Sequence, residues 1–245
     1  MTINYSYQIE QNGIVIRKEW DSFSRSIFLS GSSRKIYRIN DCWKNIPEQL
    51  YLYSSAFTEA LLAHPEKENI PQRYKKGLVI KAYAPRINKD YCLAICGNQK
   101  SLGHWDPEKA VLMSDTNFPE WQIELDASKL KYPLEYKFIL YNKQEKKADC
   151  WEKNPNRYLA DPELKTNETL VISDRYVYFD IPAWKGAGIA IPVFSLKSEK
   201  SFGVGDFGDL KRMVDWASKY SPESYSDFTG QRHHHDSCMD GLLSL

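Results

Sequence analysis

The chain has 245 residues, and its 42% hydrophobic content suffices for one or two globular domains. Lys and Arg number 33 against 32 Asp and Glu, so the formal charge of +1 excludes a strong bulk attraction to nucleic acid or acidic membranes. The N-terminus lacks a basic segment followed by an apolar run, and no stretch approaches the roughly 18 apolar residues of a membrane span.

The cysteine and aromatic contents point to a protein of the cell interior with surface aromatics. The five cysteines are odd in number and form no zinc-type CxxC pair, which favours reduced thiols and a cytoplasmic location. The 7 Trp and 16 Tyr exceed what a core of this size usually needs, so some of them are expected to make surface contacts. Neither a cofactor nor a metal site is predicted.

The N-terminal segment repeats a pattern that occurs again later in the chain. Residues 5–29 ("YSYQIEQNGIVIRKEWDSFSRSIFL") and 134–159 ("LEYKFILYNKQEKKADCWEKNPNRYL") each have an alternating strand, a turn, a second strand ending in Trp, and an Arg shortly after. Residues 1–44 are therefore predicted to be the second half of a domain. Such a half is expected to be strained, to self-associate or to be poorly ordered unless the rest of the chain covers its inner face. We favour a structural role for its Trp20.

Residues 45–76 change period. Apolar residues recur three or four positions apart and predict an amphipathic helix; they are Leu50, Tyr53, Phe57, Leu61 and Leu62. The polar stretch that follows, "PEKENIPQRYKK", is predicted to be a linker.

Residues 77–175 carry strand signals almost throughout. The runs "GLVIKAYAP", "YCLAICG", "EWQIELDA", "LEYKFILYN" and "ETLVISDRYVYFDI" are rich in β-branched and aromatic residues and are separated by turn residues. Strands without intervening helices predict an antiparallel sandwich.

Four linked motifs in this region resemble carbohydrate-binding module family 20, the starch-binding module of many amylases, glucoamylases and glucanotransferases. They are "SLGHWDPEKAVLM", "FPEWQIEL", "LEYKF" and "CWEKNPNR". The resemblance implies an immunoglobulin-like β-sandwich that binds α-1,4-glucans, with starch, maltodextrins and cyclodextrins as partners. Residues 1–44 would then be the C-terminal half of a first module of the same kind.

A glucose ring presents an apolar face and a rim of hydroxyl groups, so a receptor needs flat aromatic platforms with polar groups at their edges. In the family's first binding site, the paired platforms match Trp105 and Trp151, and the polar partners match Lys137, Glu152 and Asn156. The resemblance implies that Lys137 donates to sugar hydroxyls, Glu152 accepts from them and Asn156 does both.

A single Trp in a sandwich is more often a core residue than a platform. Trp105 and Trp151 follow turn-like segments and have polar neighbours, so we expect platforms. Trp121 matches the Trp of the family's second site, but the loop before it is short and that site's first Tyr has no counterpart. A sugar contact and a core position both remain open for Trp121. Arg157 and Leu102 are expected to be structural.

Residues 176–220 begin a different kind of structure. "IAIPVF" predicts a buried strand, and Asp209 is expected to cap a helix whose inner face carries Leu210, Met213, Val214 and Ala217. This segment resembles the first unit of the (β/α)8 barrel of glycoside hydrolase family 77, the 4-α-glucanotransferases. The resemblance implies a retaining pair of carboxylic acids on later strands, so no catalytic residue is predicted in this chain.

The Gly-x-Gly-x-x-Gly pattern at Gly203, Gly205 and Gly208 also fits a phosphate-binding loop. A dinucleotide site needs a complete βαβ unit with an acidic residue about 20 positions on. The chain stops being regular before that point, so we set this interpretation aside.

Residues 221–245 have no period and contain three consecutive His. Read one base later, a coding sequence for this tail gives a strand followed by a loop, so we expect a frame change between about Lys219 and Tyr225 and a truncated barrel. A metal site formed by His233, His234, His235, Asp236 and Cys238 is the alternative. Adjacent His in an unpatterned terminus rarely face one ion, so we do not expect it.

The fold class predicted for the whole chain is mainly β: a sandwich, preceded by a half-module and helix and followed by the first unit of an incomplete barrel. The predicted function is starch or maltodextrin binding by a part of a 4-α-glucanotransferase that lacks its catalytic groups. Two alternatives remain: an active glucanotransferase completed by a separately encoded barrel, and an interaction module that binds no glycan.

Overall fold

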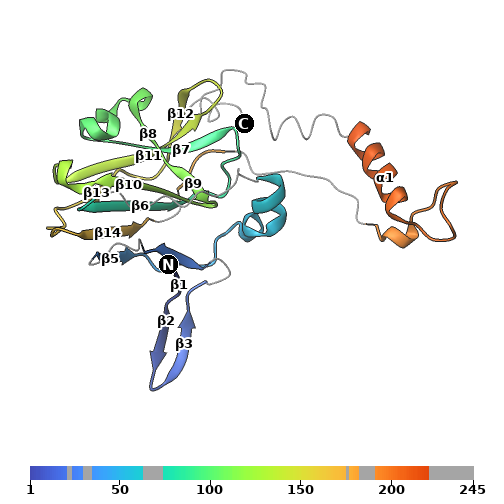
Figure 1. Ribbon diagram of the computed structural model, residues 1–245, viewed down its shortest axis with the longest axis horizontal. Coiled ribbons are helices and arrows are strands. Elements are labelled where there is room, and N and C mark those ends of the chain that lie inside the picture. The colour runs from blue at the N-terminus through green and yellow to red at the C-terminus, as the bar shows by residue number, and fades with distance from the viewer. Residues whose placement is uncertain (21–23, 30–34, 63–73, 175–176, 182–190, 221–245) are drawn as a thin grey trace. The chain divides into compact units, whose positions relative to one another are not determined.

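The computed structural model describes residues 1–20, 24–29, 35–62, 74–174, 177–181 and 191–220 (Figure 1). The described residues divide into two compact units, the first within residues 1–180 and the second within residues 181–220. Among the described helices, none is long and apolar enough to cross a membrane. The tail predicted to be aberrant, residues 221–245, lies outside the described residues.

The first unit is built from two five-stranded sheets (Figure 1). One sheet contains β12 (Lys147–Trp151), β11 (Leu134–Asn142), β7 (Tyr91–Gly97) and β8 (Val111–Leu112) in this order, with β13 (Arg157–Leu159) also paired to β11. The other contains β5 (Ile36–Asp41), β14 (Glu168–Ser173), β6 (Gly77–Tyr83), β10 (Glu120–Asp126) and β9 (Ser114–Asn117) in this order.

These sheets confirm the prediction that the chain is mainly β. Each of the five predicted runs contains a strand, and β12 is the second strand, ending in Trp151, that the internal repeat predicts. The short strands β8, β9 and β13 were not foreseen. The expected antiparallel pattern needs a correction, because β14 runs parallel to both β5 and β6. The second sheet is therefore mixed.

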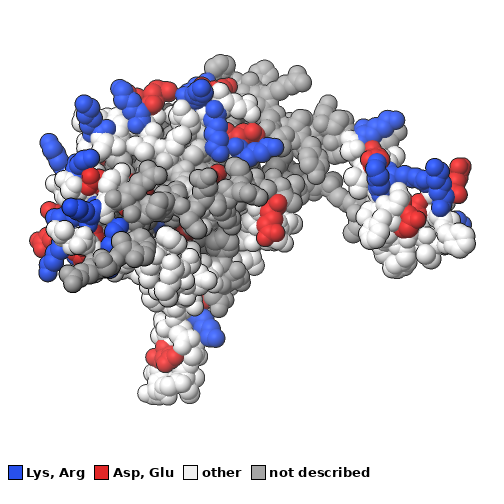
Figure 2. All heavy atoms as spheres, viewed as in Figure 1, with Lys and Arg blue, Asp and Glu red and all other residues white. Residues whose placement is uncertain are grey.

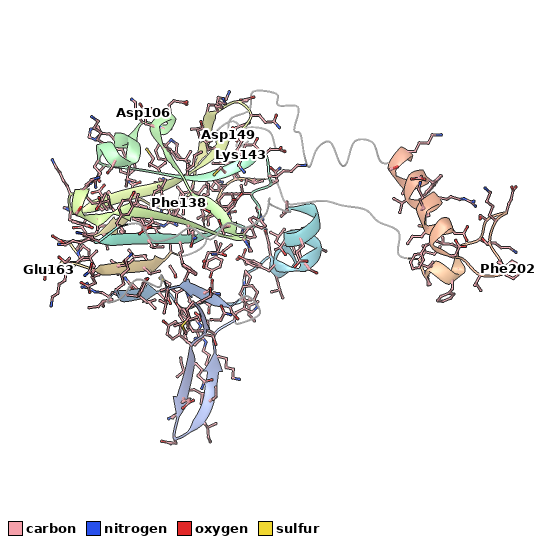
Figure 3. The ribbon with its side chains drawn as sticks, in the orientation of Figure 1. Asp106, Phe138, Lys143, Asp149, Glu163 and Phe202 are labelled. Atoms are coloured by element: carbon pink, nitrogen blue, oxygen red, sulfur yellow. The ribbon has the colours of Figure 1, made fainter. Side chains whose placement is uncertain are left out.

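The core of the sandwich follows from the alternation of side chains along each strand. On β6, Leu78, Ile80 and Ala82 lie on one face and are fully buried, and Phe138 on β11 of the other sheet is fully buried as well (Figure 3). Burying each large aliphatic side chain contributes about 1.5–3 kcal/mol. Residues on the opposite face of β6 are also buried, which indicates that something covers the outside of this sheet.

The N-terminal segment supplies that cover. Strands β1 (Thr2–Tyr5) and β4 (Arg25–Phe28) form an antiparallel pair, and Ile27 of β4 packs against Val79 of β6 and Val171 of β14. Lys81 reinforces the contact, since its Nζ donates to the Ser26 carbonyl at 2.5 Å and to Glu120 Oε1 at 2.9 Å. The inner face of β4 is thus buried within the same chain, whereas β1 stays largely exposed, with Ile3 opposite Ile27 37% exposed.

Between β1 and β4, β2 (Gln8–Gln11) and β3 (Ile14–Lys18) form a hairpin. Its turn is Asn12–Gly13, with φ values of 53° and 76°, as expected for a turn that needs two left-handed residues. Both strands are exposed along their whole length.

The predicted internal repeat extends to side-chain contacts. In the N-terminal segment, Tyr5 lies opposite Arg25, and its hydroxyl donates to Asp41 at 2.8 Å. Arg25 Nη1 lies 3.4 Å from Asp41, and Arg25 Nε donates to the buried Glu19 at 3.1 Å. These four residues join β1, β4 and β5.

The downstream counterpart repeats the arrangement with four residues of the same types. Tyr136 lies opposite Arg157, and its hydroxyl donates to Asp174 at 2.6 Å. Arg157 Nε lies 3.3 Å from Asp174, and Arg157 also pairs with the buried Glu152. The parallel pairing of β5 and β14 places Asp41 opposite Ser173, the residue before Asp174.

Residues 45–62 do not form the predicted amphipathic α-helix. They form a 3-10 turn, η1 (Leu50–Tyr53), and a short π-helix, η2 (Ala56–Leu61). The side chains of Ser54 and Thr58 bond to the carbonyls of Tyr51 and Ser54, and such local bonds compete with regular helix formation. Leu52, Phe57 and Leu62 are nevertheless buried. The predicted linker lies mostly outside the described residues.

In the second unit, the predicted helix is present as α1 (Phe207–Tyr220), but its cap differs from the prediction. Asp206, not Asp209, accepts from the first free backbone N–H groups, those of Gly208 and Asp209. Asp209 is buried in the first turn, where Ser198, Ser201 and the Asp206 N–H donate to its carboxylate.

The predicted strand at the start of this unit is also corrected. Where "IAIPVF" is described, from residue 191 onward, it forms a 3-10 turn, η6 (Val193–Ser195), and no strand. Gly205 passes so close to η6 that a Cβ would lie 2.1 Å from the Val193 carbonyl oxygen, so close backbone packing explains this glycine without a phosphate ligand. The described residues give no support for a barrel unit.

Candidate functional site

The structure brings Trp105 and Trp151 together. Their ring centroids lie 6.1 Å apart with an angle of 46° between the ring planes. Trp105 is half-buried and Trp151 is 36% exposed. Both indoles are therefore partly exposed, which is what a sugar platform requires.

Trp105 is positioned by an unusual backbone. It ends η3 (Lys100–Trp105), where Gly103, His104 and Trp105 all have positive φ, with values of 76°, 51° and 61°. Gly103 is required, because a Cβ there would lie 2.7 Å from the Lys109 carbonyl oxygen. Positive φ costs energy at a bulky residue and persists only where the surroundings fix it. Asp106 follows and caps η4 (Pro107–Lys109) (Figure 3).

Trp151 is positioned by strand register. It is the last residue of β12 and lies directly opposite Ile139 of β11, so both side chains project from the outer face of this sheet. Ile139 forms a buried cluster on that face with Ala94 and Cys96 of β7. These small side chains leave room above the sheet for the two indoles.

The predicted polar partners Lys137 and Asn156 lie beside the pair. Lys137 is two positions before Ile139 on β11, hence on the same face, and is half-buried. Asn156 is exposed and directly precedes β13. Within the described parts of the chain, neither side chain has a hydrogen-bond partner. Both are free to bond with a ligand.

Glu152 corrects the prediction that it accepts hydrogen bonds from the sugar. Its side chain is fully buried, and its carboxylate accepts from the Phe138 backbone N–H at 2.8 Å, from Asn154 at 3.0 Å and from Arg157. Burial raises the pKa of this carboxyl group, while Arg157 opposes the rise. Glu152 therefore ties β12 to β11 and supports Trp151 from below. Arg157 has the structural role expected of it.

Trp121 is a core residue and not a sugar contact, which settles the two alternatives left open from sequence. Its ring is 0% exposed and meets Phe118 edge to face at 6.2 Å. Its Nε1 donates to the Ala84 carbonyl at 3.2 Å. The side chain is satisfied inside the sandwich and presents no platform. Trp20 is likewise buried and packs on Tyr53, as the structural interpretation anticipated.

Two further residues share the outer face of β11 and were missed from sequence. Glu135 is two positions before Lys137, and Tyr158 of β13 lies directly opposite Glu135. Tyr158 is 65% exposed. The alternation of β11 could have placed Glu135, but only the pairing of β13 places Tyr158 on this face.

The site's other chemistry is limited. Over the described ranges, no group of three or more His, Cys, Asp or Glu residues could hold a metal ion. Cys42, Cys92 and Cys96 are free thiols, and burial raises the pKa of Cys92 to about 11. On the face shown in Figure 2, basic side chains over β7, β8 and β12 have acidic neighbours.

A comparison of the sequence with protein-family models identifies the domain that contains this site. Residues 79–171 match the model described as starch binding domain, of carbohydrate-binding module family 20. Residues 79–171 form a starch-binding domain. Both Trp105 and Trp151, and their polar neighbours, lie within the matched range. The resemblance found from sequence is thereby confirmed for this part of the chain.

One curated relative is 27% identical to this chain over 235 residues, the 4-alpha-glucanotransferase DPE2 of Oryza sativa subsp. japonica. The match covers 88% of this chain and 24% of the relative. The chain therefore spans about a quarter of the length of the curated relative that it matches, and the homology is distant.

Solved structures similar to the starch-binding domain include a family 20 module and a glucoamylase. The first is the module of the maltotetraose-forming amylase of Pseudomonas saccharophila, with 17% identity, a TM-score of 0.33, and coverage of 40% of this chain and 99% of that chain. The second is the family 15 glucoamylase of Hypocrea jecorina, with 22% identity, a TM-score of 0.34, and coverage of 42% and 17%.

Proposed function

We propose that the starch-binding domain holds α-1,4-glucan chains on the tilted pair of Trp105 and Trp151. The observation that carries this proposal is the 46° angle between two solvent-facing indoles 6.1 Å apart. An α-1,4-linked glucan is curved, so successive rings can stack on two tilted planes better than on one flat surface. Lys137 and Asn156 stand free beside the indoles to bond with hydroxyl groups. Maltodextrins and cyclodextrins share the required curvature.

We infer that the chain belongs to a cytoplasmic 4-α-glucanotransferase, in which this domain delivers glucan to a catalytic barrel. The distant homology to the rice enzyme supports this inference. On this view residues 1–44 are the C-terminal half of a first module, residues 77–175 a complete second module, and residues 176–220 the entry to the barrel. The repeated Tyr–Glu–Arg–Asp contacts of β1–β5 and β11–β14 favour the half-module. None of the described residues is assigned a catalytic role.

Calorimetric titration of the full chain with β-cyclodextrin and maltoheptaose tests the proposal. The unaltered chain should bind both sugars, and Trp151→Ala should lose most of the affinity, because stacked aromatic rings dominate such contacts. Trp151 is partly exposed, so the variant should keep its thermal midpoint. Trp216→Ala, which removes another half-exposed indole on α1, is the matched control and should bind like the unaltered chain.

Absence of binding by the unaltered chain at millimolar sugar would refute the proposal and favour an interaction module that binds no glycan. Incubation with maltotriose separates binding from catalysis. Binding without formation of glucose and longer maltodextrins is expected, whereas their appearance would support an active glucanotransferase.

A further inference from the structure

The outer face of β11 continues beyond the two indoles as a row of ligand-capable side chains. Ile139 lies opposite Trp151, and Glu135 lies opposite Tyr158. Side chains alternate between faces along a strand, so residues 135, 137 and 139 project on the same side. The burial pattern agrees, since Glu135 and Lys137 are partly exposed while their neighbours Leu134, Tyr136 and Phe138 are buried.

The row has an aromatic residue at each end and polar residues between them. The Tyr158 pair and the Trp151 pair are four positions apart on β11, a span of about 14 Å at roughly 3.4 Å per residue. Tyr136 pairs with Arg157, the first residue of β13, and Asn156 directly precedes that strand. Lys137 lies midway between Glu135 and Ile139 on β11, and neither Lys137 nor Asn156 has a partner among the described residues.

The fold itself gives no reason for an aromatic ring at Tyr158. The side chain is 65% exposed, and no described residue forms a hydrogen bond, ion pair or ring contact with it. Its neighbours on β13, Arg157 and Leu159, face the other way and carry the packing of this strand. The ring and hydroxyl of Tyr158 are accordingly free for a ligand on the outer face.

We propose that Tyr158 is a third aromatic contact for glucan, which makes the site prefer chains long enough to reach from the indole pair across Lys137 and Asn156. This inference rests on the proposed function. A short maltodextrin seated on Trp105 and Trp151 does not reach Tyr158, since the span exceeds one sugar ring. A longer chain lies along the row and stacks a further ring on the tyrosine.

Titration of the full chain with maltotriose and with maltoheptaose tests the inference in two variants. Tyr158→Thr removes the ring and keeps a residue suited to a strand, whereas the matched control Tyr158→Phe keeps the ring. Tyr158→Thr should weaken maltoheptaose binding about 3- to 10-fold, as expected for one stacked ring, and leave maltotriose binding unchanged. Tyr158→Phe should retain the preference for the longer chain.

Two outcomes would overturn the inference while the proposed function stands. In one, Tyr158→Thr binds maltoheptaose as tightly as the unaltered chain. In the other, it weakens both sugars by the same factor, which would place Tyr158 at the indole pair itself. If the unaltered chain binds neither sugar, the proposed function fails first and the inference falls with it. Equal thermal midpoints for the three proteins show that binding, not folding, is compared.

Discussion

Trp105 illustrates how much one side chain depends on backbone that the sequence does not reveal. Its positive φ follows two other left-handed residues, and Gly103 is needed because the chain passes against the Lys109 carbonyl. From sequence, only its turn-like setting and the family resemblance pointed to a platform. The structure adds the reason that this indole is held over the sheet at a fixed angle to Trp151.

Burial destabilises the charged form of Lys44. It is 5% exposed, and its Nζ lies 4.9 Å from the ring centroid of Tyr83 and 5.9 Å from that of Trp20. Burial, and after it the charge of the neighbouring Arg25, lower its pKa to about 8. The seam between the N-terminal strands and the complete module therefore contains an ammonium group close to neutralisation.

Stability should depend on pH through Lys44. The unfolded chain keeps this proton up to about pH 10.4, whereas the folded chain releases it near pH 8. Between these values the unfolded state binds more protons, so the contribution of Lys44 to the free energy of unfolding rises with pH, by up to about 3 kcal/mol. Below about pH 8 Lys44 is protonated in both states, so this gain in the free energy of unfolding is absent.

Urea denaturation of the unaltered chain and of Lys44→Met at pH 7.5 and 9.5 measures the effect. Other groups, such as Cys92 and the buried tyrosines, titrate in both proteins and cancel in the difference. The stability advantage of Lys44→Met should shrink as the pH rises. An advantage that is the same at both pH values would contradict the prediction.

At the scale of elements, β6 determines how the N-terminal segment is held. Strand β6 is buried on both faces. Val79 and Lys81 on its outer side contact the N-terminal strands, whereas Leu78 and Ile80 on its inner side belong to the core of the sandwich. A near-continuous apolar run is typical of a strand covered on both sides. That run was visible in "GLVIKAYAP", but the identity of the covering segment was not.

Ile27→Ala tests whether the N-terminal strands and the complete module fold as one unit. Ile27 is 5% exposed in the cluster with Val79 and Val171, so its truncation should lower the free energy of unfolding by about 2–4 kcal/mol. The matched control Ile14→Ala removes a side chain that is 67% exposed on β3 and should change it by less than about 0.5 kcal/mol. Urea denaturation compares the two, and equal losses would show that the seam contributes nothing.

Five long strands of the two sheets were predictable, whereas the short strands β8, β9 and β13, the register and the burial of polar groups were not. The alternation of β11 and the turn residues around it are local properties of the sequence. By contrast, Glu152 follows Trp151 and was predicted to bind sugar. Its carboxylate instead accepts a hydrogen bond from the Phe138 backbone N–H and pairs with Arg157. Trp121 was undecided because a core indole and a surface indole have the same sequence signature.

At the scale of the whole molecule, the described residues form a binding unit that accompanies a small second unit. The first contains the starch-binding domain with the N-terminal strands packed on its outer sheet. The second contains α1 and a glycine-rich turn organised by Asp206 and Asp209. The strand that the sequence predicted before α1 is absent where that segment is described.

The central claim is that glucan binds on Trp105 and Trp151, and indole resonances test it directly. The chain has 7 Trp, each with one indole N–H signal that a Trp→Phe variant assigns. Titration with β-cyclodextrin followed by nitrogen–proton correlation spectra should shift the Trp105 and Trp151 signals most, while the buried Trp121 signal stays close to its starting position. Binding that leaves the Trp105 and Trp151 signals unmoved would contradict the account.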